Sequence, residues 1–508
     1  MLLLIACSAG PGSESQTPLV EHVDDGVTLS DVQVCSAPSP TTTYTEAGEA
    51  WGFQAPDNVS PRHEESASLV AGDIDGDGWD DLVNVNRDGT SYYYRNTGTS
   101  FEVTDLTSVI IPMISNVLFD IDTDGDLDLV AGGNMPTTLL NEGGVFRRNE
   151  PLPLLPSTQN GAAVLIHDLS PADIDGDGVV EFYLALTYNL GDEATQYTDP
   201  VMKWAGADYT YDESIVPTDV GYRQSLDVVL FDVDGDLDED AYVANDFGIL
   251  YGGSTLLVNQ GGTFTSAEDT CFCSLLKNAK GVDIDDFNSD GRPDILVSGN
   301  PSNTLLVQLD DGSFVDETTI ANAAAIDEDA TGWGGIFLDF DNDGQRDLFP
   351  AQGDRWNEGN DHPHFDAPLK LLRQEEGVFS DVSAAMGIAA MGSFRAVSAL
   401  DFNHDGVEDL VATQMDDRPM FYVSDGCTEA GWVEVEAPIG SKVVIEAGGR
   451  TQTNWIRTDA GYQSHRPPRV HFGLGEARTI DRLTVTRLDG TELGATWIEA
   501  QRRITIGE

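Results

Sequence analysis

Seven short acidic segments recur along the chain, and each alternates carboxylate or carboxamide side chains with other residues. They follow the nine-residue pattern D-x-(D/N)-x-D-(G)-x-x-(D/E), and successive copies begin 47 to 62 residues apart. Side-chain oxygens at positions 1, 3, 5 and 9 can converge on one cation, and position 7 can add a backbone carbonyl. Calcium accepts about six to eight such hard oxygen ligands in flexible geometry, whereas zinc prefers nitrogen or sulfur. The pattern therefore predicts up to seven calcium sites.

The predicted calcium ligands are the side chains at positions 1, 3, 5 and 9 of loops 1 to 7. In chain order they are Asp73, Asp75, Asp77 and Asp81; Asp120, Asp122, Asp124 and Asp128; Asp173, Asp175, Asp177 and Glu181; Asp232, Asp234, Asp236 and Asp240; Asp286, Asn288, Asp290 and Asp294; Asp339, Asp341, Asp343 and Asp347; and Asp401, Asn403, Asp405 and Asp409. Position 6 is Gly in six loops, as a sharp turn with positive φ favours. Loop 4 has Leu237 there and loop 3 ends in Glu181. Whether loops 3 and 4 hold calcium is therefore left open.

An EF-hand shares the early acidic spacing but needs a bidentate Glu at position 12 and a helix on either side. Position 12 here is Asn84, Ala131, Leu184, Val243, Val297, Pro350 and Ala412. Short β-rich stretches follow each loop, instead of amphipathic helices. The sequence thus excludes EF-hands.

Each repeat also predicts the strands that must position its loop. Positions 2 and 10 are apolar in all seven copies, which indicates that the loops are anchored in a core. Each unit gives a strand, the loop, a second and a third strand, then a Gly turn and an aromatic strand, as in L139-L-N-E-G-G-V-F146. Four short antiparallel strands in a repeat of roughly 55 residues favour a propeller blade over a solenoid coil. We therefore predict an all-β fold: a seven-bladed β-propeller over residues 41–426 and a small β-rich domain over residues 431–508.

Ring closure can be inferred from the ends of the repeat. The seventh unit has three strands up to about Val423, and a lone strand-like segment at Tyr44 precedes the first unit. We predict that this N-terminal strand completes the last blade, which makes a disulfide bond between Cys35 and Cys427 sensible. The chain leaves open whether Cys271 and Cys273 form a strained disulfide or two free thiols. Four such cysteines suit an oxidising compartment.

These motifs resemble a known family. The loops with their aromatic-led strands, and F379-S-D-V-S-A-A-M-G-I388, resemble FG-GAP/VCBS repeats of the integrin α type. The segments P438-I-G-S-K-V-V-I-E-A-G-G449, G461-Y-Q-S464, H471-F-G-L-G475 and D481-R-L-T-V-T-R-L-D-G490 resemble the ASPIC/UnbV domain. The combination is similar to the cartilage acidic protein-like family over roughly residues 44–505. The resemblance implies a secreted or surface calcium-binding propeller, but Arg487-Leu488 departs from the aromatic-Pro pair usual before the final Asp-Gly, so any property of that pair is in doubt.

The charge of the chain restricts its partners. The net charge is −62, and residues 431–508 balance ten acidic with ten basic side chains, so the excess lies in the first 430 residues. Such a field opposes nucleic acids and anionic lipids, and we exclude nucleic-acid partners. We expect the surplus acid to serve solubility in salty water. The arginines of the C-terminal domain, among them Arg466, Arg469, Arg502 and Arg503, favour docking onto the acidic propeller over binding an anionic glycan.

The N-terminus resembles the end of a bacterial lipoprotein signal. In M1-L-L-L-I-A-C7 the apolar run precedes a cysteine, so residues 1–7 are predicted to be a lipoprotein-type signal remnant, with lipidation of Cys7 after cleavage in front of it. A chance apolar start is the alternative. Residues 8–40 are rich in Ser, Gly, Pro and Thr and predict a flexible tether. We expect a monomer outside the cytoplasm, secreted or held at a bacterial cell surface or outer membrane, with membrane contact only through the lipid.

Catalytic motifs such as a nucleophile elbow, a Walker loop or a zincin helix do not occur in the sequence. We therefore predict a non-enzymatic calcium-binding propeller that acts as a binding or adhesion module for a protein or glycan. The alternative is a polysaccharide-active lyase or hydrolase. Its candidate residues are Trp356, His362 and His364 in the long insertion at 353–366, which we interpret more simply as a polar loop.

Overall fold

The computed structural model describes residues 21–36, 38–39, 41–53, 67–86, 89–110, 114–133, 136–149, 152, 164–188, 198–205, 209–217, 224–354, 366–415 and 417–507. Within these ranges the helices are three single turns, α1 (Gly48–Trp51), α2 (Gly248–Tyr251) and α3 (Glu268–Cys271). None of them has the length and apolar character needed to cross a membrane. The predicted all-β class is confirmed.

Seven sheets in the described ranges share one plan, in which each acidic loop joins the innermost strand to the second strand. The innermost strands are β4 (Ala67–Gly72), β8 (Asn116–Phe119), β12 (Val164–Ala172), β16 (Ser225–Phe231), β20 (Asn278–Asp285), β24 (Thr331–Leu338) and β30 (Phe394–Leu400). The second strands, each beginning at loop position 9, are β5 (Asp81–Asn86), β9 (Asp128–Ala131), β13 (Glu181–Tyr188), β17 (Asp240–Asn245), β21 (Asp294–Asn300), β25 (Asp347–Gly353) and β31 (Asp409–Gln414).

Two further antiparallel strands complete each sheet towards the outside. The third strands are β6 (Ser91–Asn96), β10 (Thr137–Asn141), β14 (Val201–Trp204), β18 (Thr255–Asn259), β22 (Thr304–Gln308), β27 (Leu372–Glu375) and β32 (Met420–Ser424). The outermost strands are β7 (Phe101–Asp105), β11 (Phe146–Arg148), β15 (Tyr209–Asp212), β19 (Phe264–Ser266), β23 (Phe314–Asp316), β28 (Val378–Asp381) and, from the N-terminus, β3 (Tyr44–Glu46). A small extra ladder pairs β26 (Ala367–Pro368) with β29 (Met391–Gly392).

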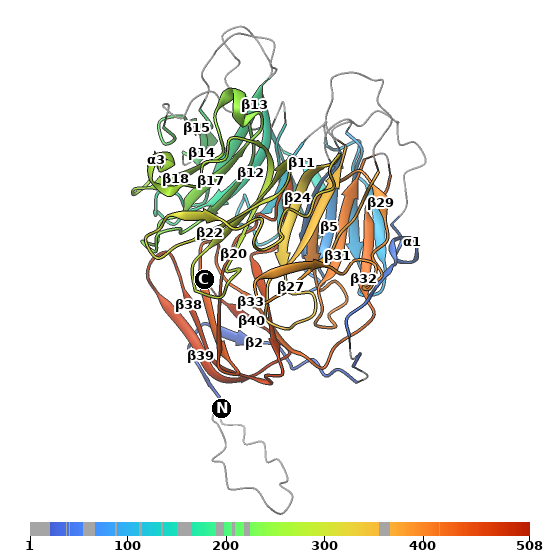
Figure 1. Cartoon of the computed structure of the whole chain (residues 1–508). Helices are drawn as coiled ribbons and strands as arrows, with labels where there is room; N and C mark the ends of the chain where they lie inside the picture. The colour runs from blue at the N-terminus through green and yellow to red at the C-terminus, as the bar shows by residue number, and fades with distance from the viewer. Residues whose placement is uncertain are drawn as a thin grey trace, which may run out of the picture.

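The seven innermost strands contact one another in cyclic order, and β30 contacts β4. Apolar side chains of adjacent sheets fill the space between them, as Val397 and Leu410 do with Ile336 and Phe349. The sheets stand side by side in Figure 1, with the C-terminal strands against one end. A propeller architecture is the result.

The N-terminal strand closes the last sheet as predicted. In β3, Tyr44 pairs with Ser424 and Glu46 with Tyr422 of β32. Nearby, Cys35 and Cys427 form a disulfide bond with their Cα atoms 5.8 Å apart. Cys271 and Cys273, whose state the sequence left open, are also bonded to each other.

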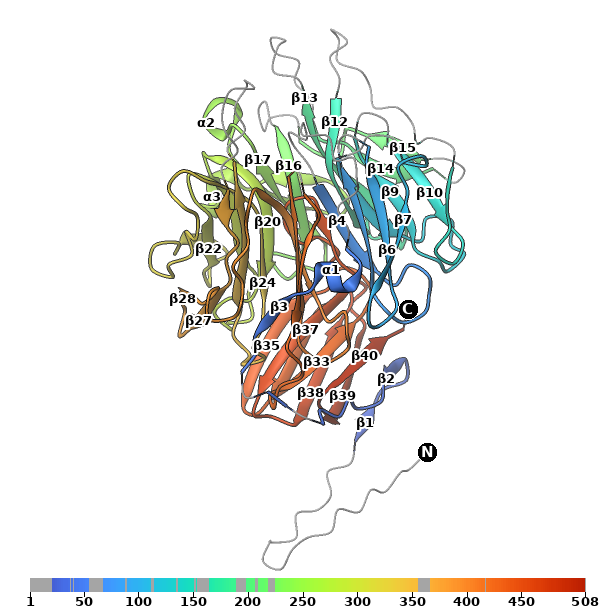
Figure 2. The same ribbon diagram turned by 90° about the vertical axis from the view of Figure 1, so that its right-hand side faces the viewer.

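The C-terminal residues form a separate module of two sheets around one apolar core. One sheet has the order β1 (His22–Val23), β39 (Glu492–Glu499), β38 (Thr479–Thr486), β34 (Lys442–Ala447), β35 (Arg450–Trp455). The other has the order β2 (Val27–Leu29), β40 (Arg502–Ile506), β33 (Gly431–Glu436), β37 (Arg469–Gly475). Figure 2 shows β1 and β2 at this module, far from the tops of the propeller sheets.

The predicted tether over residues 8–40 needs correction for its second half. His22 pairs with Thr496 and Val27 with Ile506, so this segment adds two short edge strands to the module. Val23, Val27 and Leu29 pack against the module core, which explains why the segment is ordered despite its polar composition. The predicted signal remnant at residues 1–7 and residues 8–20 of the predicted tether lie outside the described ranges.

One part of the module enters the centre of the ring. We call residues 457–466 the channel segment; it includes β36 (Ser464–His465), which pairs in parallel with Leu69 and Val70 of β4. Ser464 Oγ donates a hydrogen bond to the carbonyl of Val397 in β30, and Tyr462 packs on Trp333 of β24. Other residues of the segment contact β8, β12, β16 and β20. Because it touches the innermost strand of every sheet, the segment occupies the ring axis.

Candidate metal centres and the docked module

All seven loops share two internal hydrogen bonds. The carboxylate at position 1 accepts the backbone N–H of position 6 at 2.7 to 3.1 Å in every copy. The carboxylate at position 5 accepts the backbone N–H of position 7 at 2.9 to 3.1 Å, again in every copy. These bonds hold the first and fifth side chains on the inside of the turn, where the ligand prediction requires them.

Loops 3 and 4 keep this arrangement despite their sequence departures. Leu237 adopts φ 72°, close to the 85° of Gly178 at the same position of loop 3, although left-handed backbone costs a residue with a side chain about 1 kcal/mol or more. Glu181 accepts the N–H of Ile174 at 3.0 Å, as Asp128 accepts that of Ile121 at 3.1 Å in loop 2. The two loops therefore have the same geometry as the others.

Carboxylate oxygens converge in the loops as a calcium site needs. In loops 1 to 4, three acidic groups each bring a ligand oxygen within 4.8 Å of the others: Asp73, Asp75 and Asp77; Asp120, Asp122 and Asp128; Asp173, Asp175 and Glu181; Asp232, Asp234 and Asp240. Buried oxygens of Asp73, Asp173 and Asp175 have no hydrogen-bond donor. Such an oxygen is costly unless a cation faces it, so this donor set fits a hard divalent ion.

Burial raises the pKa of several of these carboxyl groups and so disfavours their charged forms. Desolvation, as the largest cause, raises the pKa of Asp81 and of Asp286 to about 7, and that of Asp240 and of Asp294 to about 8. Neighbouring carboxylates add to the effect in each loop. A bound divalent cation would offset both causes, because it favours the charged forms.

Position 9 also links adjacent sheets, which the sequence reasoning missed. The carboxylate of Asp128 accepts the N–H of Asn141 at 2.7 Å, and the Asn141 amide donates at 2.7 Å to the carbonyl of Ile74 in the preceding repeat. An Asn or Gln at the end of the third strand makes the same two bonds in five sheets: Asn96, Asn141, Asn259, Gln308 and Gln374. The signal was available, because each of these residues lies one or two positions after an apolar or aromatic pair and shortly before a Gly turn.

Basic side chains lie against some ligand positions. Arg95 contacts Asp75 and lies 2.7 Å from Asp77, and Lys203 contacts Asp175. In loop 6, Arg373 lies 2.9 Å from Asp341 and 3.0 Å from Asp343. A carboxylate has two oxygens, so such a base and a cation can share one group.

The C-terminal module covers loops 6 and 7. In loop 6 the carboxylate of Asp339 accepts the N–H of Gly473 at 3.0 Å, and the side chains of Asn342 and His471 are 2.6 Å apart. In loop 7 the indole of Trp432 lies so close to Gly406 that a Cβ there would meet its Nε1 at 1.9 Å. The same face that presents predicted calcium ligands is therefore a docking surface.

Charge complementarity at this surface agrees in part with the prediction for the module arginines. Arg469 pairs with Asp80 at position 8 of loop 1, and Arg466 lies 3.8 Å from Asp283 of β20. Arg503, by contrast, pairs with Glu434 at 3.0 Å inside the module. Arg502 lies 3.6 Å from Glu21, on the added N-terminal segment. Sequence could identify the basic module but not which of its arginines face the ring.

A polar cleft opens beside loops 5 and 6, where β35 approaches them. Its volume is about 530 Å³, and its lining includes Asn288, Gln345, Glu376, Arg450 and Gln452. Arg450 is held by a 2.7 Å bond from its guanidinium to the carbonyl of Asp343. Most of the lining residues have amide, hydroxyl or charged side chains, which suits a ligand rich in hydroxyl or carboxyl groups.

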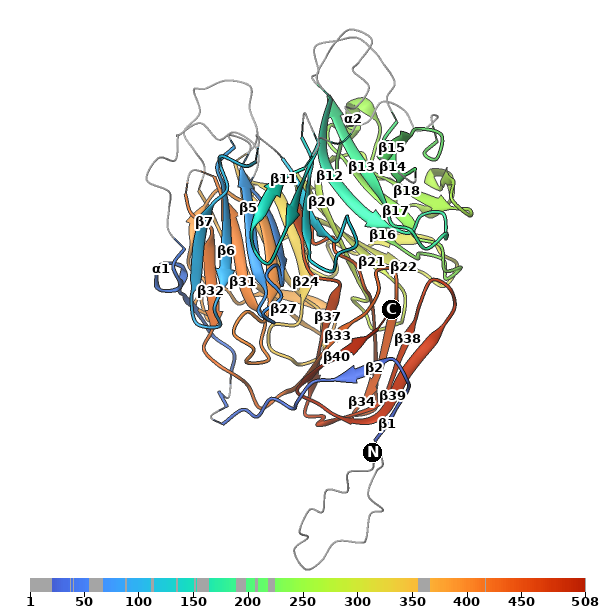
Figure 3. The same cartoon turned by 180° about the vertical axis from the view of Figure 1, so that it is seen from behind.

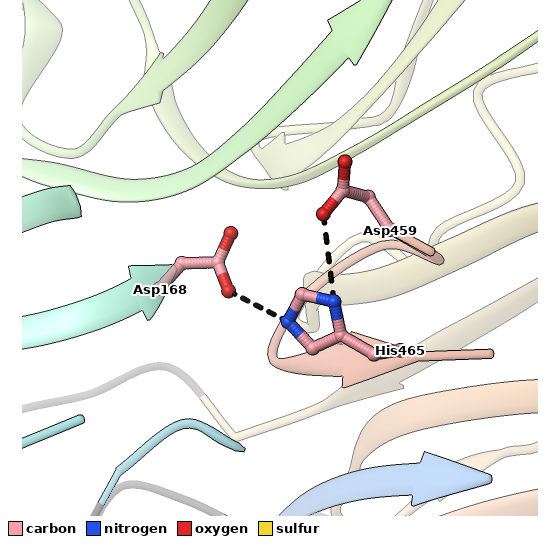
Figure 4. A group of neighbouring side chains, drawn as sticks. All are labelled: Asp168, Asp459 and His465. Carbon is pink, nitrogen blue, oxygen red and sulfur yellow. Dashed lines mark hydrogen bonds and ion pairs between the residues drawn. The ribbon is translucent and has the colours of Figure 1, made fainter. Parts of the chain in front are cut away.

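A second group of titratable side chains is buried on the ring axis. Figure 4 shows the imidazole of His465 between the carboxylates of Asp168 and Asp459. The Asp168 oxygen is 3.1 Å from Nε2 and the Asp459 oxygen 3.4 Å from Nδ1. No motif in the sequence joins these residues, because Asp168 and His465 are 297 positions apart. Trp356, His362, His364 and Cys7, named as candidates from the sequence, lie outside the described ranges.

Comparison with known proteins connects the two parts to families. An FG-GAP-like repeat model matches residues 73–131, 232–297 and 286–349, and an ASPIC and UnbV model matches residues 435–508. Cartilage acidic protein 1 of Mus musculus and that of Homo sapiens are each 26% identical over 316 residues, which are 56% of this chain and 46% and 45% of theirs. The chain spans about half the length of these curated relatives.

Matches among solved structures have low sequence identity. BBS1N in complex with ARL6DN, soaked with lead, matches with a TM-score of 0.44 and 12% identity, over 72% of this chain and 95% of that chain. The resemblance of the sequence to FG-GAP repeats followed by an ASPIC/UnbV domain is confirmed by the family models.

Proposed function

We propose, for a chain that combines FG-GAP-like repeats with an ASPIC and UnbV domain, a non-enzymatic role as a calcium-stabilised binding module outside the cytoplasm. The observation that carries this proposal is the sevenfold repetition of one hydrogen-bonded acidic turn. Four of these turns bring three acidic ligand groups together, and two of the four contain buried carboxylate oxygens without a donor.

In this proposal calcium is structural. Each loop joins the first two strands of a sheet, so an ion would fix the start of the second strand relative to the end of the first. Extracellular calcium modules bind with Kd of about 10⁻⁴ to 10⁻³ M, which suits sites that stay filled outside the cell. At one hundred times Kd, each ion adds about 2.7 kcal/mol to the free energy of unfolding.

Terbium luminescence and calorimetry with calcium test this role. We expect several calcium ions per chain and terbium emission that calcium displaces. The paired variant Asp122→Asn and Asp124→Asn in loop 2 should lose one site, because both side chains are predicted ligands. Asp310→Asn is the matched control, since Asp310 is 94% exposed and outside the loops. A chain that binds no calcium at millimolar concentration would contradict the proposal.

The proposed ligand is a protein or glycan that enters the polar cleft beside loops 5 and 6. Arg450 and Glu376 offer one charge of each sign there, and Gln345 and Gln452 offer amides. A glycan array combined with a pull-down from outer-membrane extract tests this step. The proposal is supported if Gln452→Ala weakens binding and Asp310→Asn leaves it intact. Binding that no cleft variant changes would show that the ligand binds at another site.

We also propose that the protein is located at the cell surface or is secreted. The acidic composition, the two disulfide bonds and the extracellular sense of the family resemblance favour the cell surface or secretion. Lipidation at Cys7 would add a membrane anchor. Metabolic labelling with a fatty acid in an expressing bacterium, with Cys7→Ser as the control, should label the parent chain alone.

A further inference from the structure

The three side chains on the ring axis are cut off from solvent. His465 and Asp168 are each 1% exposed and Asp459 is 5% exposed. Asp168 comes from β12 of the propeller, whereas Asp459 and His465 come from the channel segment of the module. The contact therefore joins the two parts of the chain at a buried position on the ring axis.

Other hydrogen bonds fix the orientation of both carboxylates. Asp168 accepts the hydroxyl of Ser115 at 3.2 Å and the N–H of Val228 at 3.2 Å. Asp459 accepts the hydroxyl of Ser170 at 2.7 Å. The Asp168 oxygen that accepts the Ser115 hydroxyl also faces Nε2 of His465. The Asp459 oxygen that Ser170 leaves free faces Nδ1 from the other side of the ring, at an ion-pair distance (Figure 4).

This placement decides the protonation of the imidazole. A neutral imidazole has one N–H donor and one lone-pair nitrogen, and an ionised carboxylate has acceptors alone. With a carboxylate on each side, one nitrogen of a neutral ring would direct its lone pair at an oxygen. Only the imidazolium can donate on both sides.

We propose that His465 is held as a buried imidazolium between Asp168 and Asp459, and that this charge locks the channel segment into the ring. Loss of its proton leaves a lone pair against a carboxylate on the ring axis. The module is therefore fastened to the propeller by a proton-dependent lock, which weakens as the medium becomes alkaline.

The groups around His465 support the assignment. The charged groups acting on it are Asp168 from β12 and Asp459 from the channel segment itself; burial lowers its pKa, but these two carboxylates raise it above the usual value. Asp227 of β16 acts on Asp168, and Arg457 acts on Asp459. The contacts of the segment with β4 and β30 are to Leu69, Val70 and Val397, whose side chains do not titrate.

The direction of the pH effect follows from the sign of that shift. A group whose folded pKa is raised stabilises the folded state below its unfolded pKa and loses this contribution as pH rises through the folded value. For His465 the loss begins above about pH 6.5, the ordinary value for His. One released proton changes the opening equilibrium of the segment by about tenfold per pH unit.

Hydrogen exchange of the full chain, in saturating calcium and from pH 6.5 to 9.5, tests the lock. After correction for intrinsic exchange, peptides that cover residues 457–466 should open more readily by up to tenfold per pH unit between about pH 6.5 and the folded pKa of His465, and should level off above that pKa. His465→Gln should remove that slope, while His22→Gln, a change at a histidine with a 74% exposed side chain, should leave it intact. An unchanged slope in His465→Gln would overturn the proposal.

A second measurement holds even where His465→Gln does not fold. Carbon-13 labelling of the histidines reports the charge of each ring, and a buried resonance that stays in the imidazolium form well above pH 7 supports the lock. Burial lowers the pKa of His471 to about 4, so that ring is neutral at pH 7 in any case. The absence of any buried imidazolium above pH 7 overturns the lock. So does one equivalent of zinc that remains after dialysis against excess calcium and is lost in His465→Gln, because a metal would then take the place of the proton.

Discussion

Loops 2 and 6 have the same acidic turn but different surroundings. In loop 2, Asp122 and Asp124 are exposed and the turn faces solvent. In loop 6, Asp339 and Asn342 are buried under the C-terminal module, whose Gly473 donates directly to the Asp339 carboxylate. The same sequence pattern can therefore hold a cation in one repeat and, in another, also support the docking of a second part of the chain. Figure 3 shows that the module covers only one end of the ring.

Removal of calcium should have the largest effect on stability of the changes considered, and loops 2 and 6 should respond to it differently. Chelation should lower the melting temperature by on the order of ten degrees or more. Each of up to seven sites then loses the contribution of about 2.7 kcal/mol that an ion at one hundred times Kd makes to the free energy of unfolding. Differential scanning calorimetry measures the shift. Hydrogen exchange in chelator should then show loop 2 opening first, because the module still covers loop 6. An unchanged melt would exclude structural calcium.

The buried ion pair between Arg469 and Asp80 tests the docked side alone. Arg469→Met should reduce the free energy of unfolding by about 3 to 5 kcal/mol, because it leaves the Asp80 charge buried without its partner. Adding Asp80→Asn to Arg469→Met should recover much of the loss, which denaturant titration of both variants can measure. Equal stability of the single variant and the parent would show that the pair does not secure the module.

A matched pair of substitutions at position 1 compares the loops directly. Asp339→Asn should cost about 3 kcal/mol in calcium, because this carboxylate accepts bonds from Gly344 and Gly473. Asp120→Asn should reduce the free energy of unfolding by about 1 kcal/mol more than a surface control such as Asp310→Asn does. If the two loop variants melt alike, docking adds nothing to loop 6.

The pH dependence of the calcium-free protein should show the smallest effect. Burial raises the pKa of Asp128 in loop 2 to about 6 and that of Asp294 in loop 5 to about 8. Raised folded values mean that stability is greatest below about pH 4 for these groups and is lost as pH rises through about 6 and about 8. In chelator, melting at pH 5.5 should therefore exceed melting at pH 8.5 by a few degrees. Calcium should remove the difference, because the ion keeps the carboxylates charged.

Local patterns predicted the propeller, since every repeat encodes its own strands and turn. The strand at Tyr44 and the bond between Cys35 and Cys427 also followed, because counting strands exposed a missing one in the last sheet. The link between position 9 and Asn141 was not predicted, although Asn141 is visible in the sequence, because the partner of its amide lies in the preceding repeat.

Contacts between the two domains could not be predicted in the same way. The channel segment has no repeat to reveal its place, and His465 meets Asp168 only after the ring has closed. The tether prediction failed at His22 and Val27 because two or three residues are enough to add an edge strand when a sheet already offers unpaired backbone groups.

The N-terminal strands on the module have a mechanical consequence. A pull on the chain from residue 21 would load β1 and β2 in the module first, and would next reach the covalent bond at Cys35. The outermost strand of the last sheet begins only after that bond, at Tyr44. Tension applied through the N-terminus would therefore pass into Cys427 and the module, and the propeller would be shielded from unravelling.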